Sequence, residues 1–308
     1  MYKYYYYVNY QDYKENLARV EIKYLFNEEI DKKYLFSNID INPSNSPFIK
    51  YKISIIYKGN TLDDIINKIV INKLSFEKFK VHYIKSEYND IPYKERLEAA
   101  YKIGYVINGF PDLHNPEVNL AITKVNNLWV LGKYIKNDCK WQKHDDKPFS
   151  YSNALSTKMA RAIINIATSG NYDKKIVDPC CGIGTVVIEG LDLGVSIKGF
   201  EISKPIACNA RNNIEYLGYN RDIILCDDMN NINEKYDIAI VDIPYGLFSP
   251  TTIDEQISII NKCREICDRL LLVSFENMDN LIEEAGFKII DKISFSKNKF
   301  TRYISVAI

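Results

Sequence analysis

The second half of the chain alternates short apolar runs with segments of helical spacing. Five runs can each form a buried strand: KKIVDP, SIKGFEIS, DIILCDD, YDIAIVDIP and RLLLVSF. Between the second and third runs, Ile206, Ala210 and Ile214 share one helix face, after Ser203 as a candidate N-cap and before Gly218 as a stop. Strands that alternate with helices predict an α/β domain with a parallel sheet covered on both faces.

The last part of the chain adds one more helix and a hairpin. Apolar residues recur at helical spacing from Ile253 to Leu270, with Cys263 and Cys267 on the apolar face. The chain then closes with two alternating runs joined by KNK, in FKIIDKISFSKNKFTRYISVAI. This pattern predicts an antiparallel hairpin at the edge of the sheet, an unusual ending for a dinucleotide-binding fold.

The first half predicts a separate α+β region. Two helices are expected in TLDDIINKIV, where Thr61 and Asp64 have capping-box spacing, and in YKERLEAAYKIG; VNLAIT and NLWVLGKYI form a hairpin. Nearer the N-terminus, YKYYYYVNY and LARVEIKYLF are predicted to be strands of a smaller unit. We place the domain boundary in the polar stretch KNDCKWQKHDDKPFS, near residue 150.

Composition narrows the class of protein. A length of 308 residues predicts two domains, and the net charge of +0 hides an asymmetry. Up to Ser150 there are 23 Lys and Arg against 19 Asp and Glu, and afterwards 17 against 21. This is a weak indication that the N-terminal half contacts an anionic partner. Seven cysteines without a signal peptide or a long apolar run predict reduced thiols in a soluble, cytoplasmic protein that does not enter a membrane.

The stretch VDPCCGIGTVVIEG, at 177–190, is predicted to be a ligand-binding turn between a strand and a helix. Gly182 and Gly184 let the backbone approach a ligand, and the following helix directs free N–H groups towards it. The third glycine of G-x-G-x-x-G is missing and no G-K-[ST] follows, which argues against a pyrophosphate site or a Walker A loop. Asp178 would repel a phosphate and attract an amine.

Metal and triad chemistry find little support. Cys180 and Cys181 are adjacent, so they form no C-x-x-C motif, and buried thiols such as Cys263 behave as small hydrophobic residues. No metal is therefore predicted. The histidines are dispersed in the first half, at His82, His114 and His144. A hydrolase triad has no candidate nucleophile near them.

Acidic residues recur at successive strand ends. Glu201 follows the second strand, nineteen residues after Gly182, Asp227 and Asp228 follow the third, and Asp242 ends the fourth. Taken singly, each is more often a cap or a turn residue. Because parallel strands end at one edge of a sheet, the acids at four strand ends together predict a ligand site there.

These motifs resemble the class I S-adenosylmethionine-dependent methyltransferases, and DPCCGIGTVVIEG resembles the D-P-x-C-G-S-G-T-x-x-I-E-A motif of RNA guanine-N2 methyltransferases. NALSTKMARAIINIA is similar to the helix before that motif, and LHNPEVNLAIT to the L-x-N-P-D-V segment of THUMP domains. The resemblance covers most of 50–308. It implies a ferredoxin-like unit at 1–50, a THUMP-like RNA-binding domain at 51–145, and a Rossmann-like methyltransferase domain with a C-terminal antiparallel hairpin at 146–308.

The resemblance also implies roles for single residues. Asp178 would lie by the amino group of the methionine moiety, Glu201 would hold the ribose hydroxyls, and Asp228, or less readily Asp227, would hold the adenine amino group. The other residues implied in cofactor binding belong to the loop, the start of its helix and the neighbour of Glu201: Cys181, Gly182, Gly184, Thr185 and Ile202.

The [D/N]-P-P-Y signature of enzymes that methylate exocyclic amines is matched here by Asp242-Ile243-Pro244-Tyr245. The resemblance implies that Asp242 and a backbone carbonyl next to Pro244 accept the two N–H groups of the amine, and that Tyr245 stacks on the extruded base. Ile243 replaces the first proline, whose ring would fix φ in the turn.

The function implied is that of a tRNA guanosine N2-methyltransferase acting in the tRNA core, for example at guanosine 10, with S-adenosylmethionine as cofactor and tRNA as partner. An adenine-N6 methyltransferase of DNA or RNA uses the same signature and is the alternative enzyme. A non-catalytic RNA-binding protein with a relic cofactor site is the third hypothesis, motivated by Ile243 and the near-neutral charge. Acids at all four strand ends favour catalysis.

Overall fold

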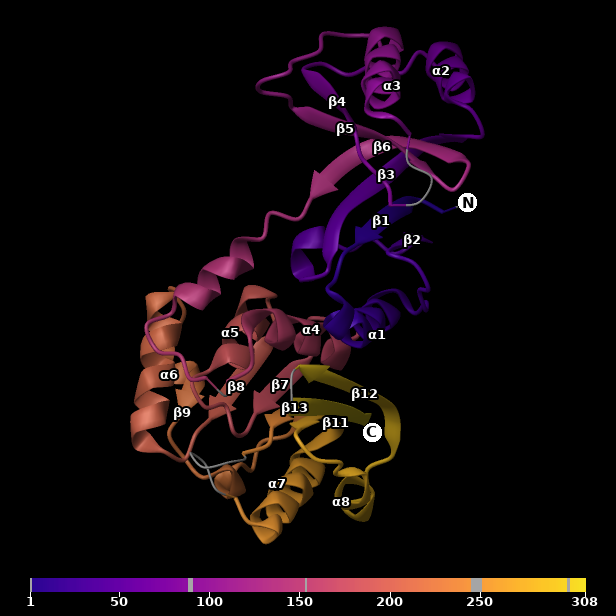
Figure 1. Ribbon diagram of the computed structural model, residues 1–308. Coiled ribbons are helices and arrows are strands. Elements are labelled where there is room, and N and C mark those ends of the chain that lie inside the picture. Colours follow the sequence, from indigo (N-terminus) through magenta and orange to yellow (C-terminus); the bar gives the residue numbers. More distant parts are fainter. Residues whose placement is uncertain (1, 88–90, 153, 245–250, 298–299) are drawn as a thin grey trace. The chain divides into compact units, whose positions relative to one another are not determined.

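The computed structural model describes residues 2–87, 91–152, 154–244, 251–297 and 300–308 (Figure 1). The chain forms two compact units, each made from separate segments. The first unit consists of Met1–Asn9, Asp31–Ser44 and Ile49–Asp138, and the second of Tyr10–Ile30, Asn45–Phe48 and Cys139–Ile308. Residues 1–50 thus contribute to both units. The division at 50 and 145 into a ferredoxin-like, a THUMP-like and a catalytic domain stays a prediction.

The first unit is built on a six-stranded sheet in the order β2-β1-β3-β6-β5-β4. Neighbouring strands are antiparallel except β4 and β5, which are parallel. The strands are β1 (Tyr4–Val8), β2 (Tyr34–Ser37), β3 (Ile49–Gly59), β4 (Phe79–Tyr83), β5 (Val118–Val125) and β6 (Leu128–Lys136). The expected hairpin is β5–β6, which confirms that prediction.

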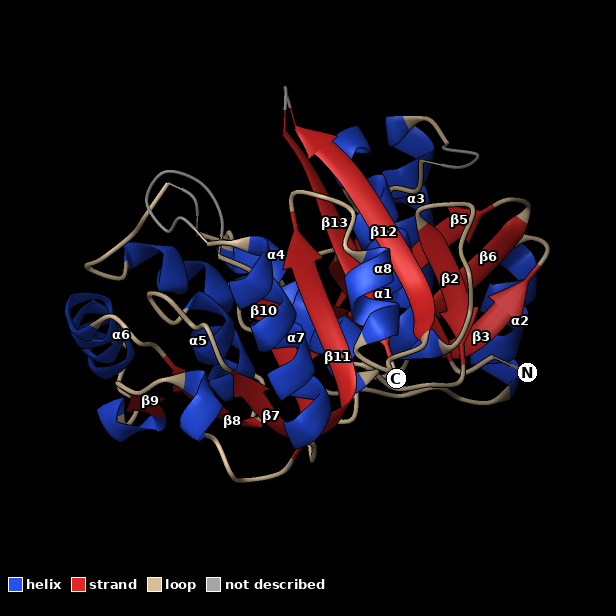
Figure 2. Ribbon diagram, turned by 90° about the horizontal axis from the view of Figure 1, so that it is seen from below, coloured by secondary structure: helices blue, strands red, loops and turns tan. Residues whose placement is uncertain are grey.

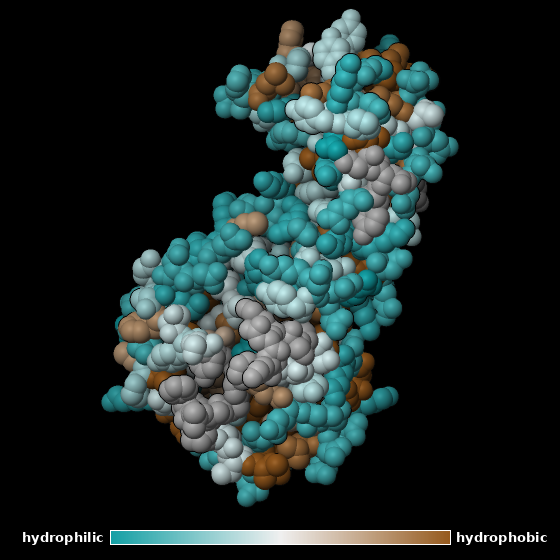
Figure 3. Space-filling view, in the orientation of Figure 1, coloured by the Kyte–Doolittle hydropathy of each residue, from teal (hydrophilic) through white to brown (hydrophobic). Residues whose placement is uncertain are grey.

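Two helices, α2 (Leu62–Ile71) and α3 (Tyr93–Val106), pack together beside this sheet (Figure 1). The side chains of Ile65, Ile69 and Ile103 are buried against strand residues. The predicted capping box is present, since the Thr61 side chain accepts from the Asp64 N–H and the Asp64 carboxylate from the Thr61 N–H. On the face shown in Figure 3, hydrophobic side chains are exposed among hydrophilic ones near α2 and α3.

The tyrosine-rich start of the chain forms β1. Tyr5 and Tyr6 are fully buried, and Tyr7 stacks on Tyr51 of β3 with 5.2 Å between ring centroids. In β1, tyrosine rings thus supply the buried apolar area that aliphatic side chains supply in many other strands. They therefore contribute to the core of the first unit.

The segment LARVEIKYLF is helical, so its prediction as a strand was wrong. It lies in α1 (Glu15–Phe26), which belongs to the second unit. Leu17, Ile22 and Leu25 are buried at helical spacing. Between them the Glu21 carboxylate accepts hydrogen bonds from Ser46 Oγ and Asn165 Nδ2, both at 2.6 Å. Apolar and polar residues alternate in this segment as they would in a strand. The helix forms because its buried residues pack against parts of the chain that are distant in sequence.

The second unit holds a seven-stranded sheet in the order β12-β13-β11-β10-β7-β8-β9. The pairs from β11 to β9 are parallel, whereas β13 is antiparallel to β11 and β12. The strands are β7 (Lys175–Asp178), β8 (Ser196–Phe200), β9 (Ile224–Leu225), β10 (Tyr236–Asp242), β11 (Cys267–Ser274), β12 (Ile289–Lys297) and β13 (Phe300–Ala307). The predicted α/β sheet and its C-terminal antiparallel hairpin are confirmed.

Helices cover both faces of the central strands (Figure 2). On one face Ile260 and Cys263 of α7 pack with Val241 and Leu272 of the sheet, and on the other α5 packs against β8. The helices are α4 (Thr157–Thr168), α5 (Thr185–Asp192), α6 (Lys204–Tyr216), α7 (Ile253–Ile266) and α8 (Asp279–Glu284). Along the described residues, no helix combines the length and apolarity needed to cross a membrane.

One boundary differs from the expectation. Helix α7 ends at Ile266, and Cys267 begins β11 with φ −146°, so neither Cys267 nor Leu270 is helical. Both side chains are buried. A run of buried apolar residues fits a helix and an interior strand equally well, which is why spacing alone placed this boundary too late.

Candidate active site

The loop between β7 and α5 is held by backbone hydrogen bonds. The Cys181 N–H donates to the Phe200 carbonyl and the Gly184 N–H to the Cys181 carbonyl, both at 2.8 Å. Gly182 has φ +54°, and a Cβ added there would meet nothing within 4 Å. Glycine at 182 therefore suits the left-handed conformation and leaves open space beside the backbone, as a ligand cradle requires.

Gly184 has a different role from the one expected. Its φ is +81°, it is the N-cap of α5, and a Cβ there would lie 3.6 Å from the Ala210 Cβ. It does not line the cavity formed by the described residues. Gly184 thus shapes the turn into the helix and faces α6.

Glu201 braces the loop from the next strand end. Its Oε2 accepts from the Gly182 N–H at 3.1 Å and its Oε1 from the Ser203 N–H at 2.8 Å. Burial raises the pKa of Glu201, while the two N–H groups oppose that shift. A carboxylate with one lone pair used on each oxygen can still accept hydrogen bonds from a diol.

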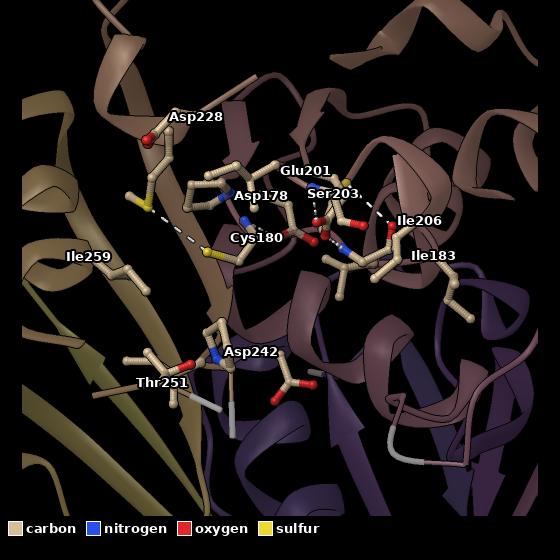
Figure 4. Close-up of a pocket in the computed structure, with 18 of the residues that line it drawn as sticks. Asp178, Cys180, Ile183, Glu201, Ser203, Ile206, Asp228, Asp242, Thr251 and Ile259 are labelled. Carbon is tan, nitrogen blue, oxygen red and sulfur yellow. Dashed lines mark hydrogen bonds between the residues drawn. The ribbon is translucent and has the colours of Figure 1, made fainter. Parts of the chain in front are cut away.

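The loop, Glu201 and the other strand ends line one cavity of about 580 Å³, entirely within the second unit (Figure 4). Figure 4 shows Asp178, Cys180 and Glu201 close together, with Asp242 and Thr251 on another side of the space. The expected site residues that line the cavity are Asp178, Cys181, Gly182, Thr185, Glu201, Ile202, Asp227, Asp228, Asp242 and Pro244. Tyr245 lies outside the described residues.

Two carboxyl groups dominate the electrostatics of the cavity, the buried Asp178 and the partly buried Asp242. Asp178 is 3% exposed, and its pKa is raised well above the usual value by burial and by the charges of Asp242 and Glu201; the Cys180 N–H donates to its Oδ1 at 3.3 Å and opposes that shift. Burial raises the pKa of Asp242 to about 7, against the opposing charge of Arg302. These carboxyl groups can bind a ligand that carries positive charge or N–H donors.

Asp242 Oδ1 is buried and has no hydrogen-bond partner among the described residues. A buried acceptor without a donor costs about 1–3 kcal/mol, so such an atom is uncommon in a folded protein. Thr185 Oγ1 is likewise buried and without a hydrogen-bond partner among the described residues. Both residues line the cavity, where a bound molecule would supply the missing partners.

The two aspartates after β9 are partly engaged by their own turn. Asp228 Oδ1 accepts from the Asn230 N–H at 2.8 Å, and Asp227 Oδ1 accepts from the Asp228 N–H at 2.8 Å and from Asn231 Nδ2 at 2.7 Å. Asp228 therefore keeps more accepting capacity than Asp227.

Both cysteines of the loop are packing residues. Burial raises the pKa of Cys180 and Cys181, which keeps the thiols protonated. A Cβ added at Gly199 would come within 2.9 Å of Cys181 Sγ, so the thiol fills space that only a glycine opposite leaves open. No cluster of three or more potential metal ligands occurs in the part of the chain that the structure describes.

The cavity also has walls that sequence reasoning missed. Tyr151 and Leu155 come from the segment before α4, and Ser258 and Ile259 from α7. The Tyr151 hydroxyl accepts from Asn209 Nδ2 at 2.8 Å. The similarity of NALSTKMARAIINIA to the family was the available signal for the first wall. Helix α7 carries no motif, so the second could not be found from the sequence.

Comparisons with known proteins agree with this geometry. Residues 145–256 match the family model described as RMKL-like, methyltransferase domain. A protein of Methanothermobacter thermautotrophicus named tRNA (guanine(10)-N2)-dimethyltransferase is 27% identical over 203 residues, which are 63% of this chain and 59% of that protein. A protein of the same name from Pyrococcus abyssi is 24% identical over 196 residues, 59% of this chain and 58% of that protein. The matches thus span less than two thirds of these relatives.

Among solved structures, TrmN from Thermus thermophilus is 13% identical, with a TM-score of 0.48, over 99% of this chain and 98% of that one. A predicted N6-adenine-specific DNA methylase from Listeria monocytogenes is 14% identical, with a TM-score of 0.44, over 99% of this chain and 96% of that one.

The residues present fit S-adenosylmethionine. Its ammonium and sulfonium groups are cationic, which suits a cavity lined by the carboxyl groups of Asp178 and Glu201, and the open space at Gly182 leaves room for its methionine part. Its ribose hydroxyls match the remaining acceptor capacity of Glu201. The resemblance to guanine-N2 methyltransferases is confirmed by the relatives of that name. Residues 145–256 thus match the family of RMKL-like methyltransferase domains.

Proposed function

We propose that the protein transfers a methyl group from S-adenosylmethionine to the N2 amine of a guanosine in tRNA. The observation that carries the proposal is Asp242, a partly buried residue at the end of β10 whose Oδ1 is buried and has no hydrogen-bond partner among the described residues. It lines the same cavity as the β7 loop and Glu201. An acceptor in this place is what an exocyclic amine requires.

The chemistry assigns Asp242 its role. The lone pair of the N2 amine is delocalised into the base, so the nitrogen is a weak nucleophile until acceptors hold its N–H groups and favour a pyramidal shape. S-adenosylmethionine supplies a methyl group on a sulfonium, whose sulfur leaves as a neutral thioether. The nitrogen gains positive charge during attack, and the nearby Asp242 carboxylate would stabilise that charge. The methylated nitrogen then loses one N–H proton, to this carboxylate or to water, and becomes neutral. The backbone carbonyl next to Pro244 would accept the second N–H.

The other cavity residues would hold the cofactor. Asp178 would face the amino group of the methionine part, and the loop at Cys181 and Gly182 would lie against its backbone. Glu201 would accept from the ribose hydroxyls while it keeps its bonds to the Gly182 and Ser203 N–H groups. Asp228, with more free accepting capacity than Asp227, would hold the adenine amino group.

The choice of tRNA rests on two observations. Both curated relatives described above carry the name tRNA (guanine(10)-N2)-dimethyltransferase, which supports guanosine 10 as the target. In addition, residues 1–150 carry the excess of Lys and Arg noted in the sequence. We infer that the N-terminal half, with its THUMP-like segment, contacts tRNA phosphates in the cytoplasm and delivers one guanine to the catalytic site.

The test is methyl transfer to unmodified total tRNA from S-adenosylmethionine labelled in its methyl group, followed by nucleoside digestion and mass spectrometry. Labelled N2-methylguanosine or N2,N2-dimethylguanosine is the expected product. Label in N6-methyladenosine, or in DNA alone, would replace the proposal by the adenine alternative. A protein that binds the cofactor and labels no nucleic acid would point to a relic site.

Two variants give the assay its control. Asp242→Asn should reduce the transfer rate at least about a hundredfold while cofactor binding stays, because an amide accepts more weakly and does not compensate positive charge. Asp237→Asn changes the same residue type on the same strand. Asp237 is exposed and accepts from the Lys175 N–H, away from the cavity, so this variant should keep the wild-type rate.

A further inference from the structure

The hairpin at the C-terminus places a cation on the same sheet face as Asp242. Asp242 of β10 is in register with Val273 of β11, and Val273 with Ile304 of β13. Residues in register share a face, and side chains alternate along a strand. Arg302, two residues before Ile304 in β13, therefore lies on the same face as Asp242. It is two strands away from Asp242 and offset by two residues in the direction in which β10 ends.

The guanidinium of Arg302 contacts an aromatic ring and a thioether sulfur. Its Cζ lies 4.9 Å from the centroid of the Phe275 ring, just beyond β11. Its Nη1 lies 3.7 Å from the Sδ of Met159, a buried residue of α4. Contact with an aromatic face and a thioether holds the group in place and removes part of its water. A charge in such a place acts more strongly on its neighbours than one in bulk solvent.

The titratable groups that face Asp242 come from three elements. Asp178 ends β7, Cys180 lies in the β7–α5 loop, and Arg302 comes from β13. Burial favours the protonated form of Asp242, and the charge of Arg302 opposes it. Within the described residues Asp242 Oδ1 has no hydrogen-bond donor of its own. Burial and the charge of Arg302 thus act in opposite directions on the protonation of Asp242.

We propose that Arg302 is a positioning residue that keeps Asp242 as a carboxylate available to the amine of the substrate. The inference deepens the proposed function and rests on it for the identity of that amine. A protonated Asp242 would keep only a neutral, weaker acceptor and would carry no negative charge to stabilise positive charge on nitrogen. Arg302 acts through Asp242 and is not itself assigned a contact with the reacting atoms.

The first experiment follows Asp242 directly, without turnover. Carbon-13 NMR of aspartate-labelled protein, with the signal assigned by Asp242→Asn, gives its titration midpoint. Arg302→Met keeps an unbranched apolar side chain on Phe275 and removes the charge, and Arg302→Gln removes it with a polar side chain. Both should raise the midpoint by about one pH unit, and Arg302→Lys should restore most of the wild-type value. A midpoint unchanged in a folded Arg302→Met or Arg302→Gln protein would overturn the proposal.

The second experiment is the pH profile of methyl transfer. In Arg302→Met the acid limb should move to higher pH by the same amount as the NMR midpoint, so the rate falls about tenfold at pH 6 and recovers at pH 8.5. A merely structural role would lower the rate equally at all pH values, and that result would also overturn it. If the wild type transfers no methyl group, the proposed function fails, whereas the NMR titration still decides the role of Arg302.

Discussion

The backbone N–H of Ile243 donates a hydrogen bond to the carbonyl oxygen of Val273, with 2.9 Å between nitrogen and oxygen. A proline in this position, as in the [D/N]-P-P-Y signature, has no N–H to donate. The Ile243 side chain is 1% exposed and packs with Val241 and Ile260 in the core. In this chain the residue after Asp242 is thus anchored by a ladder-like hydrogen bond and by burial, in place of a fixed φ.

This anchor predicts that restoring the family residue is harmful here. Ile243→Pro removes the hydrogen bond, leaves the Val273 carbonyl without that partner, and deletes buried apolar volume. We expect a loss of about 2–4 kcal/mol in the free energy of unfolding, measured by urea denaturation. Ile243→Val keeps the N–H and should cost only about 0.5–1.5 kcal/mol. Equal stabilities for the two variants would show that the hydrogen bond does not anchor the turn.

Gly182 allows a matched test of the ligand cradle. Gly182→Ala puts a methyl group into the open space beside the loop, where the cofactor would lie, so we expect the Kd for S-adenosylmethionine to rise at least about tenfold in calorimetric titration. Gly218→Ala is the control, because Gly218 also has positive φ, +86°, and open space around it, but follows α6 outside the cavity.

Both alanine variants should lose about 1 kcal/mol of stability from backbone strain, since each places a Cβ at positive φ. Only Gly182→Ala should weaken binding. If Gly218→Ala weakens binding as much, strain and not occupation of the cradle is responsible.

Glu201 predicts a graded loss of cofactor affinity. Glu201→Asp is too short to keep both bonds to the Gly182 and Ser203 N–H groups, so we expect an affinity about three- to tenfold lower. Glu201→Gln keeps the length, but its NH₂ group faces one of these N–H donors, and it should bind more weakly still. Fluorescence or calorimetric titration would measure both. An affinity higher for Gln than for Asp would mean that reach matters more than charge.

The fold was accessible from the sequence where local pattern and burial agree. The strands from β7 to β11 are short apolar runs between turn formers, and the acids at their ends line one cavity, as the parallel register requires. The prediction failed for α1, because VEIKYLF fits both periods and its burial depends on Ser46 and Asn165, far away in sequence. The prediction also failed at Cys267, because a continuous run of buried apolar residues shows neither helical nor strand periodicity.

The candidate site was predictable only in part. Asp178, Glu201 and Asp242 follow recognisable strands, so their convergence could be deduced. Tyr151 lies in the segment before α4 and Arg302 in the C-terminal hairpin. No local sequence pattern predicts that either lies near the site. The consequence of Ile243 also needed the structure, because the sequence shows the lost proline but not the hydrogen bond to Val273.

A buried charge network predicts how stability depends on pH. His144 Nδ1 lies 2.6 Å from Glu189 Oε1, and Arg161 Nη1 lies 2.8 Å from Glu189 Oε2 and 2.9 Å from Asp192 Oδ2. These contacts tie the segment at 140–146 to α4 and α5. Although burial lowers the pKa of His144, hydrogen bonds and the charges of Asp192 and Glu189 raise it to about 9. The folded protein therefore holds this proton more tightly than the unfolded chain does.

The sign of the effect follows from linkage. A raised histidine pKa contributes stability that is complete below about pH 6.5 and is lost as the pH rises through 9. Glu21 and Asp242, whose pKa values are raised to about 7, have lost their contributions by pH 7.5. Between pH 7.5 and 9.5 His144 alone should thus lower the free energy of unfolding by about 2 kcal/mol, measured by urea denaturation at several pH values. The buried thiols of Cys180 and Cys181, whose pKa values are also raised, lower it further in this range in the wild type and in a His144 variant alike. His144→Gln removes the titrating group, so its curve should be flatter over this range even if the variant is less stable throughout. Parallel curves for the two proteins would show that His144 does not carry its proton into the folded state.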